Sequence, residues 1–167
     1  MASLARRLDA NVPGPFFVDS SCIDCDACRW IAPATFESHG EHSRVHRQPA
    51  AEEETAAALR ALVACPTASI GGPKGEALRL AAASFPRELG DGVHHCGFHA
   101  ESSFGAASYF VRRPGGNLLI DSPRWNEGLA RRIEGYPPRL APPEFYAKGP
   151  KPMAKATTSK PSSDPDF

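Results

Sequence analysis

Three cysteines recur at every third position near the start of the chain, and a fourth follows much later. Cys22, Cys25 and Cys28 form a C-x2-C-x2-C pattern in the stretch CIDCDACRW, and Cys65 is followed at once by Pro66. A tight loop with this spacing can bind three irons of a cubane cluster, whose fourth iron faces away and needs a cysteine from elsewhere. A Cys-Pro step suits that fourth ligand, because proline ends a helix and turns the chain. The spacing therefore favours an iron–sulfur cluster on these four thiols.

Other uses of the cysteines remain open from the pattern alone. Structural zinc usually takes two C-x2-C pairs, whereas this chain has a triplet and a single distal cysteine, but a four-cysteine zinc module is still possible. A redox C-x-x-C pair has no need of a third cysteine at the same interval. Five cysteines in total is an odd number and does not suit a secreted disulfide framework.

The elements that must position these thiols can be read from the surrounding residues. The stretch 51–65 predicts a helix that delivers Cys65, with three glutamates in its first turn and an apolar face formed by Ala58, Leu59, Leu62 and Val63. Residues 15–21, 34–38 and 43–48 predict short strands, and residues 67–72 predict another. Further along, SYFVRRPGGNLLIDS predicts a hairpin with a buried apolar strand at LLID, and residues 126–135 predict a helix capped by Asn126 and Gly135.

Composition and charge narrow the class of protein. Apolar residues make up 41% of the 167, so a core can form, and the formal net charge is zero. That balance argues against a partner bound through bulk charge, whether nucleic acid or an anionic membrane. We find neither a secretory signal nor an apolar run long enough to span a bilayer, and we therefore expect a cytoplasmic protein.

The cysteine pattern also carries a family resemblance. CIDCDACRWIAPATF together with ALVACPTASI resembles a single-cluster [4Fe-4S] ferredoxin of bacterial type, over about residues 15–72. The resemblance implies that the four cysteines ligate one cluster and that Pro33 and Phe36 pack the small fold. Since Cys25 is present, it implies [4Fe-4S] and not [3Fe-4S]. The implied role is one-electron transfer to a redox protein or an enzyme.

Acidic side chains accompany the triplet. Asp19, Asp24 and Asp26 would lower the reduction potential of a cluster if their negative charge lay beside it. They can equally be read as solvated loop residues.

The stretch 92–125 is similar to the N-terminal strands of the metallo-β-lactamase fold, with Asp121 of LLIDS where the first-motif aspartate of that family belongs. The metal-binding H-x-H-x-D-H motif of such hydrolases does not follow, so the resemblance implies a truncated relative without a catalytic site. His94, His95 and His99 lie near Cys96. On a strand, however, His94 and His95 would face opposite sides, so we expect packing roles for the histidines and a free buried thiol at Cys96.

We therefore expect an α+β chain that carries electrons and is not an enzyme. Its parts are a lead-in (1–14), a ferredoxin-like [4Fe-4S] domain (15–75), a partial metallo-β-lactamase-like hairpin and helix segment (76–135) and a disordered proline-rich tail (136–167). We expect the third part to be weakly stable or to self-associate, because an incomplete sandwich exposes strand edges.

Overall fold

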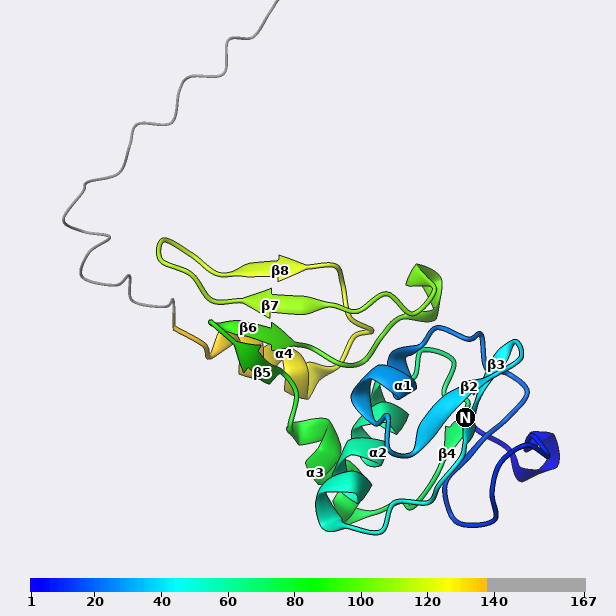
Figure 1. The fold of residues 1–167 in the computed structure, drawn as a ribbon. Coiled ribbons are helices and arrows are strands. Elements are labelled where there is room, and N and C mark those ends of the chain that lie inside the picture. Colours follow the sequence, from blue (N-terminus) through cyan, green and yellow to red (C-terminus); the bar gives the residue numbers. More distant parts are fainter. Residues whose placement is uncertain (138–167) are drawn as a thin grey trace, which may run out of the picture.

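A computed structural model describes residues 1–137, which form an N-terminal unit and a four-stranded sheet with two helices (Figure 1). The predicted mixture of helices and strands is confirmed. The predicted tail lies outside the described residues except for its first two positions. Of these, Tyr136 packs against the rings of His94 and Phe110.

The N-terminal unit holds all four cysteines of the predicted cluster site. It is built from two antiparallel strand pairs and two helices, with a short 3-10 turn (η1) before them. The elements are η1 (Leu4–Arg6), β1 (Phe17–Val18), α1 (Ala27–Ile31), β2 (Phe36–His39), β3 (His42–Val45), α2 (Glu52–Ala64) and β4 (Ile70–Gly71). Strand β1 pairs with β4, and β2 pairs with β3 across a turn at Gly40.

Helix α2 forms the predicted element almost residue for residue. The three glutamates of its first turn favour its start, and Glu54 accepts a hydrogen bond from the backbone N–H of Ala50 at 2.9 Å. Its apolar face packs into the core, where Ala58 and Leu59 are buried in the same cluster as Phe36. Pro33, which the resemblance also assigned to the packing, is exposed.

The second unit is an antiparallel sheet in the order β5-β6-β7-β8, with α3 leading into it and α4 following it. Its elements are α3 (Glu76–Ala83), β5 (Arg87–Gly90), β6 (Val93–His95), η2 (Glu101–Ser103), β7 (Tyr109–Val111), β8 (Leu118–Ile120) and α4 (Glu127–Glu134). The predicted hairpin is β7–β8, with Tyr109 opposite Ile120. Asn126 caps α4 as predicted, because its side-chain oxygen accepts a hydrogen bond from Leu129 N at 2.9 Å.

The structure corrects the expectation that LLID is buried. Leu118, Leu119 and Ile120 are 39%, 50% and 51% exposed, because β8 is an edge of the sheet. The sequence did not predict α3, β5 or α1; helix α1 has only five residues, too few for a periodic pattern to show.

The two units contact each other close to Cys65. Arg124 donates hydrogen bonds to the carbonyls of Pro66 and Val63, and the backbone N–H of His99 donates to Ala64 O at 3.2 Å. The second unit is thus held by hydrogen bonds against the end of α2.

Candidate metal centre

The four predicted ligands come from two places in the fold. Cys22 and Cys25 lie on the loop before α1 and are half-buried. Cys28 lies in α1 and is 7% exposed, and Cys65 lies at the end of α2 and is 8% exposed. The loop turns through Asp24 and Asp26, both with positive φ, a conformation that aspartate tolerates better than most residues.

The electrostatics of the thiols show that they lie close together. The pKa of Cys28 is raised to about 12, chiefly by burial; negative charge on Cys22, Cys65 and Cys25 contributes to the rise, and a hydrogen bond with the Ser43 side chain opposes it. Burial likewise raises the pKa of Cys25, with Cys65 and Cys22 adding to it. At Cys25 and Cys28 the neutral thiol is therefore favoured until a cation compensates the charge, as expected where metal binding displaces protons.

Backbone N–H groups point at two of the sulfurs. Ser43 N donates to Cys22 Sγ at 3.5 Å, and Ser69 N donates to Cys65 Sγ at 3.3 Å. Such donors stabilise thiolate ligands and raise the potential of a cluster. The close cysteines, their burial and these donors fit an anionic, thiolate-ligated group.

The acidic residues beside the triplet are not simply solvated. Arg29 forms ion pairs with both Asp24 and Asp26, and its guanidinium also donates to Ser43 Oγ at 2.9 Å. Burial lowers the pKa of Arg29, but hydrogen bonds to the two carboxylates raise it by more. One cation therefore offsets part of the negative charge that the sequence places near the cluster.

Asp19 has a structural role. Its side chain is fully buried and accepts hydrogen bonds from Ser3 N, Arg6 Nη2 and the Ser21 backbone and hydroxyl. Burial raises the pKa of Asp19, but the bonds from Ser21 and Ser3 and the charge of Arg6 lower it to a net value below normal. This carboxylate ties the lead-in to the loop that begins the cysteine triplet.

Sequence reasoning did not find Gly105, which lies against Cys25. A Cβ built on this glycine would lie 2.7 Å from Cys25 Cβ and 3.1 Å from its sulfur. Only a residue without a side chain permits this approach, and φ is +80° there. No local pattern marks the position, because the contact joins two units of the fold.

The histidines of the second unit follow the predicted alternation. His94 packs on Phe110 and Tyr136, whereas His95 contacts Trp30, Phe85 and His99. Cys96 is fully buried and free, as predicted. Within residues 1–137, no group of three or more His, Cys, Asp or Glu side chains is arranged to hold a single metal ion.

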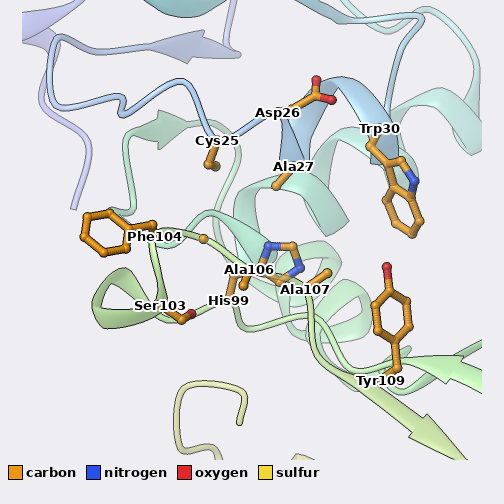
Figure 2. Close-up of a pocket in the computed structure, with 11 residues that line it drawn as sticks. Cys25, Asp26, Ala27, Trp30, His99, Ser103, Phe104, Ala106, Ala107 and Tyr109 are labelled. Carbon is orange, nitrogen blue, oxygen red and sulfur yellow. The ribbon is translucent and has the colours of Figure 1, made fainter. Parts of the chain in front are cut away.

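A cavity opens beside Cys25, between α1 and the loop that leads to β7. Figure 2 shows Cys25 and Phe104 on one side of it and Trp30 and Tyr109 on the other, with His99 between them. Cys25 therefore borders an open cavity and is also packed against Gly105 of the second unit.

Residues 18–72, about a third of the chain, match the family described as "4Fe-4S single cluster domain of Ferredoxin I". No curated protein and no solved structure matched the chain. The match spans all four cysteines and names the cofactor as a [4Fe-4S] cluster, which decides against the zinc module. Among the described residues, no helix has both the length and the apolar character needed to cross a membrane.

Proposed function

We propose that this ferredoxin-type domain binds one [4Fe-4S] cluster through Cys22, Cys25, Cys28 and Cys65 and transfers single electrons. The observation that carries the proposal is the gathering of four thiols from the α1 loop and the end of α2, with a backbone N–H donor on Cys22 and another on Cys65. When bound, the cluster supplies the site that accepts and releases an electron.

The chain's own residues hold and tune that site. The N–H donors of Ser43 and Ser69 stabilise negative charge on the sulfurs, and Arg29 offsets the nearby carboxylates. Gly105 packs closely against Cys25, so the second unit covers part of the cysteine loop. The half-buried Cys22 and Cys25 leave the other side near the surface, where a redox protein or an enzyme domain could dock.

Matched cysteine variants test the ligand set. Anaerobically purified protein should be brown and contain about four irons per chain, with an EPR signal on reduction. Cys65→Ser should lose or degrade the cluster, while Cys96→Ser, at an equally buried free thiol, should keep it. Loss of the cluster in Cys96→Ser with retention in Cys65→Ser would contradict the assignment, as would a colourless protein with one zinc.

We also propose that residues 76–135 correspond to the opening strands of a metallo-β-lactamase-like fold. The antiparallel order of β5 to β8 and the position of Asp121 directly after β8 support this. The H-x-H-x-D-H motif does not occur in the sequence. The proposed role of this chain is therefore electron transfer and not hydrolysis, and metal-dependent hydrolase activity in the purified protein would refute it.

A further inference from the structure

The end of helix α2 places a ligand thiol where a helix disfavours negative charge. Cys65 directly follows Ala64, the last residue of α2, and the backbone carbonyls there form the negative end of the helix dipole. Basic side chains in the last turn of a helix can offset that charge, but the last turn of α2 has none. A thiolate that binds iron at Cys65 would therefore be stabilised by a cation from another part of the chain.

The second unit supplies such a cation. Arg124, which follows β8, donates from Nη2 to Val63 O at 3.2 Å and from Nη1 to Pro66 O at 3.4 Å. Because these carbonyls precede and follow Cys65 in the chain, the guanidinium lies at the helix end that carries the ligand. The backbone N–H of Arg124 donates to Phe98 O at 2.6 Å, which helps to fix the segment in place.

A second donor from the same unit reaches this helix end. The backbone N–H of His99 donates to Ala64 O at 3.2 Å, so the second unit binds several carbonyls at the end of α2. Burial lowers the pKa of His99, an interaction with the Gly105 backbone opposes this, and the charge of Arg124 lowers it further. Both side-chain hydrogen bonds of Arg124 go to neutral carbonyls, so neither cancels its positive charge.

A cation at this place acts on electron transfer through the charge of the site. Reduction adds negative charge to a cluster that is already anionic with four thiolates, so a nearby cation favours the reduced form. We propose that the second unit raises the reduction potential of the cluster through Arg124, the cation that completes the end of α2. Arg124 would act on the proposed cluster, so this role rests on the proposed function. It gives a part in electron transfer to a residue outside the ferredoxin-type match.

Two substitutions at one position separate charge from packing. Arg124→Gln keeps a hydrogen-bond donor and removes the charge, whereas Arg124→Lys keeps the charge. Arg113→Gln is the matched control, because Arg113 Nε donates to Gly116 O in the β7–β8 turn. Figure 1 shows this turn at the end of the sheet away from the N-terminal unit.

The potential of each anaerobic holoprotein is measured by spectroelectrochemical titration at low salt, after its iron content and cluster absorbance are recorded. A wild type without a cluster would contradict the proposed function as well, whereas intact clusters with equal potentials would contradict only the role of Arg124. If Arg124→Gln loses its iron, retention of the cluster in Arg124→Lys would support the need for charge, and loss in both variants would overturn it.

We expect Arg124→Gln to lower the equilibrium constant for reduction by at least about three-fold, which is about 28 mV at about 59 mV per ten-fold. The shift is modest because Arg124 is exposed and water screens its charge. Arg124→Lys should restore most of it, and Arg113→Gln should leave the potential unchanged.

Loosening of the contact between the units would act in the opposite direction. Water that reached the cluster would stabilise its more highly charged reduced form and raise the potential. A raised or unchanged potential in Arg124→Gln would therefore overturn the proposal, as would equal shifts in the glutamine and lysine variants.

Discussion

Replacing Gly105 by alanine should strain the cysteine loop, because the new side chain would press on Cys25 from the second unit. The new Cβ would lie 2.7 Å from Cys25 Cβ and 3.2 Å from Pro66 Cγ. Cys25 Cβ is bonded directly to the backbone, and its sulfur is held when it ligates iron, so neither can swing aside. The two units must move apart or the cysteine loop must shift.

The cost has two parts that a matched control separates. An L-residue in the left-handed region costs about 1–2 kcal/mol, and φ is +80° at Gly105 and +83° at Gly115. Nothing lies within 4 Å of a Cβ built on Gly115, so Gly115→Ala carries only the backbone part. Overpacking adds about 1–3 kcal/mol, so Gly105→Ala should lose about 2–5 kcal/mol in total.

The assay follows unfolding and cluster loss together. Anaerobic urea titrations monitored by tryptophan fluorescence give the stability of each variant, and cluster absorbance in the presence of an iron chelator gives the rate of bleaching. Both variants should unfold at lower urea than wild type. Gly105→Ala should unfold earlier than Gly115→Ala and should bleach faster, because its strain acts on Cys25.

Equal stabilities and equal bleaching rates for the two variants would refute the reasoning. That result would mean that the second unit does not press on the cysteine loop in solution. Glycine would then be needed at position 105 only for its backbone conformation.

Three further outcomes follow from side chains elsewhere. Burial, with the charge of His99, lowers the pKa of His95 from 6.5 to about 4. The unfolded chain therefore binds a proton more readily, and stability should fall by about 2 kcal/mol between about pH 7 and 5; His95→Phe should flatten that loss in urea titrations. Arg29→Gln should lower the cluster potential in a redox titration, because Asp24 and Asp26 lose their cation; an unchanged potential would exclude this tuning. Asn126→Ala should cost about 1 kcal/mol by removing a helix cap, and no change in thermal unfolding would show that α4 does not limit stability.

Local patterns predicted helix α2, which ends at Cys65, and several elements around it, but not α1, which holds Cys28. Helix α2, strands β2 and β3, the β7–β8 hairpin and the cap of α4 all depend on spacing within a few residues, and all are present. The family match likewise depends on cysteine spacing within residues 18–72. These features are readable because residue type and local backbone conformation are coupled over one or two turns.

The sequence by itself determined the kind of group that four thiols at this spacing can hold. Only the tertiary structure decided what surrounds them. Gly105 against Cys25, the His95–His99 pair and the exposure of β8 arise from packing between segments far apart in the chain. Burial and pairing across such distances depend on how the units meet, and no short pattern encodes that geometry.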